Sequence, residues 1–144
     1  MPFIEHGGRR ILFVHIPKTG GGAIERWLRQ HGRVRLLVAQ GTPGCARATP
    51  QHWRFRDLAD LFGEDYFDYA FTIVRNPFDR LESEYRMQAA LRKDAFFKSM
   101  PPFGQWVETA LARYAKDPWT LDNHLRPQWQ FLARTMRVFR YEDG

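Results

Sequence analysis

Residues 11–28, ILFVHIPKTGGGAIERWL, decide the fold of this chain. The apolar run 11–16 ends at a proline and is typical of a short buried strand. Lys18 and a threonine then lead into three consecutive glycines, which permit a tight turn. Residues 23–31 carry apolar side chains at helical spacing and predict an amphipathic helix. A strand, a glycine-rich turn and a helix N-terminus favour phosphate binding, to which Lys18 would add a cation.

This turn differs from a Walker A loop. A Walker A loop ends in Gly-Lys-Ser/Thr, whereas here Lys18 precedes the glycines. The sequence also shows no evident acidic site for magnesium, so a nucleotide kinase is disfavoured. By itself the glycine turn is equally typical of a strand-to-helix connection that binds nothing.

A second strand, residues 71–74, runs directly into RNPFDRLES at 75–83. Asparagine followed by proline is a typical helix start, so a helix is predicted from that asparagine. Arg80 and Ser83 then share one face of the helix, and Arg75 lies beside them at the end of the strand. Guanidinium groups and a hydroxyl that converge at a helix N-terminus suit a phosphate dianion.

The two motifs, HIPKTGG at 15–21 and VRNPxxRxxS at 74–83, resemble those of the sulfotransferase family. The resemblance is closest to the branch that acts on carbohydrates, which includes the glycosaminoglycan sulfotransferases. In this family the first motif holds the 5′-phosphosulfate of PAPS (3′-phosphoadenosine 5′-phosphosulfate), and the second holds its 3′-phosphate. The resemblance therefore implies a sulfotransferase that uses PAPS as donor and a hydroxyl group, expected to belong to a saccharide, as acceptor.

The resemblance also assigns roles within the donor site. Lys18 is predicted to be catalytic, because it would reach the bridging oxygen of the leaving phosphate. Arg75 and Ser83 are predicted to hold the 3′-phosphate, whereas Arg80 more often ties the local structure together. The Thr19 hydroxyl and backbone amides of the turn would hold the 5′-phosphate, so the predicted donor residues of the first motif are Pro17, Lys18, Thr19, Gly20, Gly21, Gly22 and Ala23.

The general base is predicted to be a histidine. Carbohydrate sulfotransferases often carry this base a little upstream of the second motif, where His52 lies. His124 is the alternative base, because its His-x-x-Pro-Gln stretch is similar to a segment near the acceptor side of the family, where Arg126 would contact an anionic acceptor. His15 lies inside a strand and is predicted to be structural. The histidines are dispersed in the sequence, so no metal site is predicted.

The first motif departs from the family pattern after its second glycine. The family commonly continues with Thr-Ser or similar residues, whose hydroxyls line the 5′-phosphate, but here these places are Gly22 and Ala23. Each lost hydrogen bond to a charged group weakens binding by roughly 1.5–3 kcal/mol. Weaker PAPS binding is therefore expected. The alternative is a non-catalytic nucleotide- or anion-binding domain derived from the same fold.

Charge and composition favour some classes of ligand and location over others. The formal net charge of +6 favours an anionic ligand. Nucleic acid binding is disfavoured, because the basic residues are scattered and no nucleic-acid motif is present. No apolar run approaches membrane-spanning length. Cys45 is the only cysteine, so no internal disulfide can form and a cytoplasmic location is expected.

The 144 residues suit one sulfotransferase-like domain, 1–144. Because strands and helices alternate, an α/β fold is predicted, P-loop-like and three-layered, with a mostly parallel central sheet flanked by helices. Family members usually continue beyond a comparable Tyr-Glu pair, so the chain is expected to be a minimal member or to lack a C-terminal portion. The oligomeric state is left open. Residues 1–10 are predicted to be a loose terminus or a turn before the first strand, and the strand that feeds the second motif is predicted to span 68–74 with its helix at 76–92. The other predicted elements are strands at 34–39 and 136–141 and helices at 55–62 and 103–115.

Overall fold

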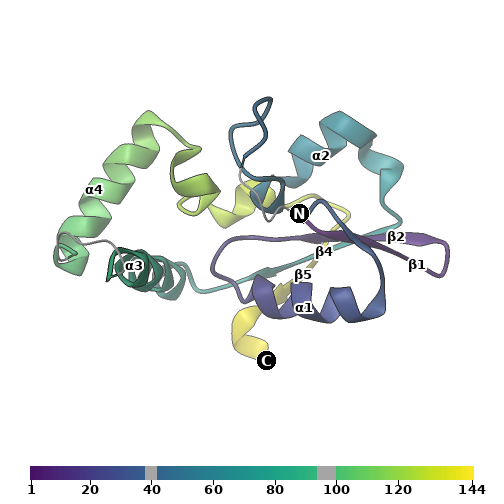
Figure 1. The fold of residues 1–144 in the computed structure, drawn as a ribbon, viewed down its shortest axis with the longest axis horizontal. Coiled ribbons are helices and arrows are strands. Elements are labelled where there is room, and N and C mark those ends of the chain that lie inside the picture. Colours follow the sequence, from purple (N-terminus) through teal and green to yellow (C-terminus); the bar gives the residue numbers. More distant parts are fainter. Residues whose placement is uncertain (38–41, 94–99) are drawn as a thin grey trace.

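The structure is a computed structural model that describes residues 1–37, 42–93 and 100–144. Within this part of the chain a five-stranded sheet lies at the centre of the molecule (Figure 1). Its strands are β1 (Phe3–His6), β2 (Arg9–Val14), β3 (Val34–Arg35), β4 (Tyr69–Val74) and β5 (Arg137–Arg140). They lie side by side in the order β3-β1-β2-β4-β5.

The sheet is mixed. β2, β4 and β5 pair in parallel, whereas β1 pairs antiparallel with both β2 and β3. The prediction of a mostly parallel sheet is therefore wrong, because β1 occupies residues that were expected to form a loose terminus. Gly7 and Gly8 have φ values of 56° and 74°, and this left-handed pair reverses the chain from β1 into β2.

Helices lie on both faces of the sheet and at one end of it. α1 (Gly21–His31) lies on one face, α2 (Phe55–Phe62) lies on the other, and α3 (Pro77–Lys93) packs beside α4 (Phe103–Lys116) at the end (Figure 1). These bounds agree with the predicted helices to within two residues. Of the predicted strand 34–39 only β3 is a strand among the described residues, and its last two positions lie outside them. No helix in the described ranges combines the length and apolar character that crossing a membrane requires.

Alternation along β1 and β2 divides the core between the two faces. Leu12 and Val14 pack toward α2, whereas Phe13 packs with Leu28 of α1 on the opposite face. β4 lies parallel to β2 with Val14 opposite Thr72, and the Thr72 hydroxyl donates to the Val14 carbonyl at 2.7 Å. The carboxyl ends of these two strands therefore meet at one edge, and the two predicted motifs leave the sheet side by side.

Candidate active site

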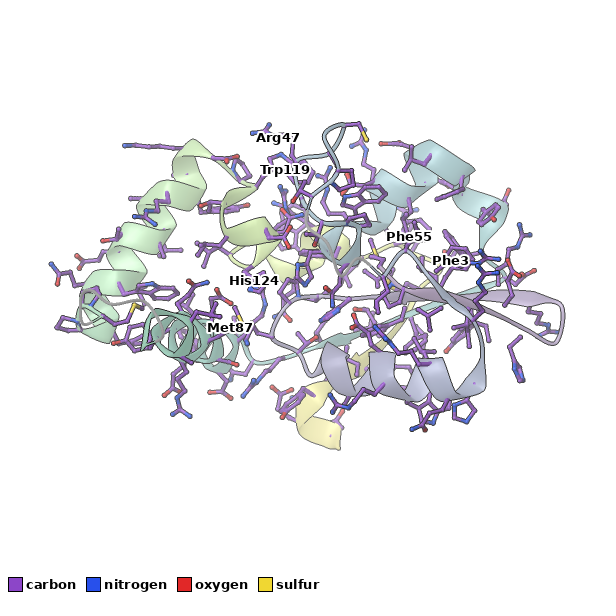
Figure 2. The ribbon with its side chains drawn as sticks, in the orientation of Figure 1. Phe3, Arg47, Phe55, Met87, Trp119 and His124 are labelled. Atoms are coloured by element: carbon purple, nitrogen blue, oxygen red, sulfur yellow. The ribbon has the colours of Figure 1, made fainter. Side chains whose placement is uncertain are left out.

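A cleft of about 560 Å³ opens where the two motifs leave the sheet. The loop after β2, the first turn of α1 and the inner face of α3 form most of its wall. Met87 of α3 and His124 both line the cleft, and their labels lie near one another in Figure 2. The structure thus brings together most of the predicted site residues, namely Pro17, Lys18, Gly20, Gly21, Gly22, Ala23, His52, Arg75, Ser83 and His124.

Lys18 lies in a left-handed backbone conformation with φ of 69°. Such a conformation is uncommon in a residue with a side chain, and where it is retained it often marks a functional site. The Lys18 ammonium donates to the Met87 sulfur at 3.3 Å, which is a weak acceptor. Within the described residues no carboxylate pairs with Lys18. The ammonium is therefore available to an anionic ligand in the cleft.

The Thr19 side chain points away from the cleft. It is fully buried, and its hydroxyl donates to the Ile16 carbonyl at 2.8 Å. This hydrogen bond stabilises the turn from inside. The prediction that the Thr19 hydroxyl holds the 5′-phosphate is not supported, because the turn directs that side chain into the core.

Gly21 is required by packing rather than by backbone conformation. A Cβ atom added at Gly21 would overlap the imidazole ring of His15, because it would lie much closer to the ring atoms than van der Waals contact allows. At Gly22 a Cβ would meet only the Arg26 guanidinium, at 3.9 Å. A side chain would therefore fit at Gly22 but not at Gly21, although both glycines lie in the same turn of the helix.

Replacing Gly21 with alanine is expected to destabilise the protein by about 1–3 kcal/mol, because the His15 ring must move. Gly22→Ala is the matched control and should leave the melting temperature nearly unchanged. Thermal unfolding followed by circular dichroism measures both variants. Equal melting temperatures for the two variants would contradict the close approach of His15 to the turn.

Arg75 lines the cleft and has one buried donor without a partner among the described residues. Its backbone N–H and carbonyl are both bonded to the Gln128 side chain, at 2.9 and 2.7 Å. Its guanidinium donates to the Lys18 carbonyl at 3.3 Å and lies 4.6 Å from the centre of the Tyr141 ring. The Nε atom is buried and has no partner in the described part of the chain. A buried donor without a partner is costly, so an anion at this position would be stabilising.

Arg80 ties three segments together, as the sequence analysis expected of it. Its guanidinium donates to the carbonyls of Pro17, Arg126 and His124 at 2.8, 3.0 and 2.6 Å. Burial lowers the pKa of Arg80 to about 10, and the neighbouring Glu84 opposes this shift. Arg80 therefore joins the first motif to α3 and to the segment that carries His124.

Three histidines line the cleft as neighbours. The His52 ring lies between those of His15 and His124, with centroids 5.2 and 4.7 Å away and with the rings nearly perpendicular. A carboxylate oxygen lies within hydrogen-bond distance of each Nδ1 atom, which leaves Nε2 as the remaining nitrogen. The pairs are His15–Glu25 at 2.5 Å, His52–Asp122 at 2.7 Å and His124–Glu84 at 2.5 Å.

His52 has the protonation state that a base requires. Burial is the largest cause that lowers its pKa to about 4, and the other two histidines lower it further, against the opposing effect of Asp122. The imidazole is therefore neutral at neutral pH. A carboxylate at Nδ1 holds the proton on that nitrogen, so Nε2 keeps its lone pair.

Asp122 is held in place by hydrogen bonds and by an unusual loop. Its carboxylate accepts from the backbone N–H and the hydroxyl of Thr49, at 2.6 and 2.7 Å. Burial alone would raise the pKa of Asp122, but the hydrogen bonds from His52 and Thr49 outweigh burial and lower it. Asp122 lies in a run of three left-handed residues, 121–123, with φ values of 50°, 55° and 66°. This strained conformation directs an ionised carboxylate at His52.

His52, Asp122 and His124 also form the group in the described residues that could hold a metal ion. Their ligand atoms lie within 4.8 Å of one another. Because His52 and Asp122 are hydrogen-bonded directly to each other, at 2.7 Å, we interpret the group as hydrogen-bonded acid–base residues. The absence of a metal requirement stays a prediction. Three of the histidines that are dispersed in the sequence are nevertheless neighbours here, because the fold assembles them from separate segments.

Arg126 does not line the cleft. Its guanidinium is buried and donates to Asn123, Gln130 and the Pro118 carbonyl, at 2.8, 2.6 and 3.1 Å. It also lies 4.6 Å from the centre of the Trp119 ring. The prediction that Arg126 contacts an acceptor is therefore not supported, because these contacts use its donors to shape the loop before His124.

Several residues that line the cleft, or that lie behind its histidines, were not predicted from the sequence. Glu84 and Asp122 lie 40 and 70 residues from the histidines that they face, whereas Glu25 lies 10 residues from His15. Tyr141 was noted only as the start of a Tyr-Glu pair. The missed residues are Glu25, Arg26, Gln51, Glu84, Met87, Asp122 and Tyr141.

Comparison with known proteins gives one match. A sequence model described as "Sulfotransferase family" matches residues 2–142, which is nearly the whole chain. No curated protein and no solved structure matches significantly. The matched region includes both motifs, the three histidines and their carboxylates.

Proposed function

The chain belongs to the sulfotransferase family, and we propose that it transfers the sulfuryl group of PAPS to a hydroxyl group of a carbohydrate-like acceptor. One observation carries this proposal. The two sequence motifs, which we propose to bind phosphate, and a histidine oriented by a carboxylate converge on one cleft. Each motif would thus bind one anionic end of the donor, and the histidine would accept the proton of the acceptor hydroxyl in the same cleft.

In the proposed reaction the acceptor oxygen attacks sulfur, and the bond from sulfur to the donor's bridging oxygen breaks. His52 takes the hydroxyl proton on Nε2, while Asp122 stabilises the imidazolium that forms. The leaving phosphate gains negative charge, which Lys18 and the N–H groups at the start of α1 stabilise. His124 is the alternative base, because its Nδ1 faces Glu84 and its ring lies beside that of His52.

The 3′-phosphate is proposed to bind at Arg75 and Ser83. The buried, unpaired Nε of Arg75 supports this position, since an anion there would satisfy it. Tyr141 packs against the same guanidinium and also approaches Gly20, whose added Cβ would lie 3.0 Å from the tyrosine ring. Tyr141 therefore holds Arg75 close to the first motif.

The finer features of the proposal rest on the sequence motifs. The carbohydrate acceptor is inferred from their likeness to the carbohydrate branch of the family. Cys45 is a free, exposed cysteine, and a cytoplasmic location stays a prediction. The oligomeric state is open.

A non-catalytic binding domain remains the second candidate, because Gly22 and Ala23 lack the hydroxyls that are common in the family. The His52–Asp122 pair favours the enzyme. A domain that only binds anions has no need of a neutral imidazole oriented by an ionised carboxylate in a strained loop.

Calorimetric titration with adenosine 3′,5′-bisphosphate, the desulfated donor product, tests the donor site. The bisphosphate is expected to bind more tightly than ATP, and Arg75→Ala should weaken it about 10–100-fold, a loss of about 1.5–3 kcal/mol. Arg33→Ala, which removes an exposed arginine outside the cleft, should change nothing. A folded protein that binds ATP equally well, or that binds no bisphosphate, would contradict the proposal.

A further inference from the structure

The first turn of α1 combines a strong positive end with few side-chain donors. Gly20 at the N-cap makes no side-chain cap, and the first turn contains no acidic residue. Gly22 and Ala23 are exposed at the cleft but carry no hydroxyl. The start of α1 thus lacks the side-chain donors that usually assist anion binding at a helix N-terminus.

Arg26 lies one helical turn beyond Gly22 and reaches back over it. Residues four apart share a helix face, and helical side chains lean toward the N-terminus. The Arg26 Nη1 atom accordingly lies 3.9 Å from the position that a Cβ of Gly22 would take. Arg26 lines the cleft together with Lys18 and Arg75. The absence of a side chain at residue 22 keeps the space between the guanidinium and the helix start open.

Among the residues that the structure describes, the guanidinium of Arg26 has no competing partner. It is exposed, and in the ranges that the structure describes it forms neither an ion pair nor a hydrogen bond. Its neighbour Glu25 is turned inward, where its carboxylate bonds to His15 and Gln51. The Arg26 guanidinium therefore faces the cleft as an uncompensated cation.

We propose that Arg26 binds the 5′-phosphosulfate end of the donor, in place of the hydroxyls that Gly22 and Ala23 lack. The inference rests on the proposed function. A guanidinium offers several N–H donors in a plane and binds oxyanions through two parallel hydrogen bonds. This chain would thus use an arginine of α1 where the family commonly has short hydroxyl side chains in the loop.

The test compares two ligands that differ only at the 5′ end. Arg26→Ala is expected to weaken adenosine 3′,5′-bisphosphate about 10–100-fold in calorimetric titration. The same variant should leave the affinity for adenosine 3′-monophosphate, which lacks the 5′-phosphate, nearly unchanged. Arg29→Ala is the matched control, because it removes an equal charge from an exposed position of the same helix.

Gly22→Thr supplies an independent measurement. The site has room for a side chain, and a threonine hydroxyl there would bind the same phosphate. In the Arg26→Ala background, Gly22→Thr is expected to increase the affinity for adenosine 3′,5′-bisphosphate several-fold. In the wild-type background the gain should be smaller, because Arg26 already occupies that side of the phosphate.

The outcomes separate this proposal from the proposed function. If the wild type binds the bisphosphate and Arg26→Ala binds it equally well, the role of Arg26 is overturned and the donor site stands. If Arg26→Ala weakens both ligands equally, or Arg29→Ala weakens the bisphosphate as much, Arg26 acts only as general surface charge. If the wild type binds no bisphosphate, both proposals fail together.

Discussion

Replacing His52 with alanine is expected to lower kcat about 10²–10⁴-fold, which is the usual contribution of a general base. Binding of adenosine 3′,5′-bisphosphate should be nearly unchanged, because His52 acts on the acceptor hydroxyl. The measurement is transfer of labelled sulfate from PAPS to a panel of glycosaminoglycans. His31→Ala, at an exposed position outside the cleft, is the control and should retain full activity.

The pH profile of the wild type gives a second test of the same residue. The pKa of His52 is lowered to about 4, mainly by burial, so the neutral base persists in mildly acidic solution. The acid limb of kcat/KM should therefore fall near pH 4, well below the ordinary histidine value of 6.5. An acid limb near pH 6.5, or full activity of the His52→Ala variant, would contradict this base. Loss of activity in His124→Ala alone would move the role to His124.

The same pKa links protonation of His52 to stability. The unfolded chain binds this proton below about pH 6.5, whereas the folded protein binds it only below about pH 4. The contribution of neutral His52 to stability is therefore complete above pH 6.5. It is lost progressively as the pH falls toward 4. The His52→Ala variant should lack this part of the pH dependence of unfolding.

Replacing Lys18 with methionine is expected to lower kcat about 10²–10³-fold, the range for loss of one group that stabilises developing charge. Methionine keeps most of the length of the side chain beside Met87 but removes the ammonium. The affinity for the bisphosphate should fall less than kcat, because the charge on the bridging oxygen develops only during transfer. Lys116→Met, at the exposed end of α4, is the control.

The His52→Ala and Lys18→Met substitutions also discriminate between an enzyme and a non-catalytic binding domain. An enzyme loses turnover in both variants, whereas a non-catalytic binding domain has no turnover to lose. Transfer activity that is present in the wild type and unaffected by Lys18→Met would contradict the proposed role of Lys18. Tight bisphosphate binding without transfer to any acceptor would favour the binding domain.

Much of the donor site could be predicted because it is local. A strand, three glycines and a helix start are contiguous in the sequence, so the position of Lys18 and of the N–H groups follows from short-range backbone geometry. The same holds for Arg75 at the end of β4 and Ser83 on α3. The direction of the Thr19 hydroxyl could not be predicted, since it depends on which side of the turn becomes the core.

The order of the strands could be predicted only in part. Short apolar segments indicate strands, but their pairing depends on the turns between them and on which faces become buried. β1 was not predicted because it has only four residues, two apolar and two polar. In addition, Gly7 and Gly8 are typical of a loose terminus as well as of a hairpin.

The sequence by itself determined the proposed anion-binding part of this protein, because contiguous residues build each motif and the parallel pairing of two strands brings the motifs together. Only the tertiary structure decided the acid–base part. His52 and its carboxylate Asp122 are 70 residues apart. The pKa of His52 depends on burial and on two further histidines that the fold places beside it. No local pattern encodes such a group, since its properties arise from distant segments that exclude water together.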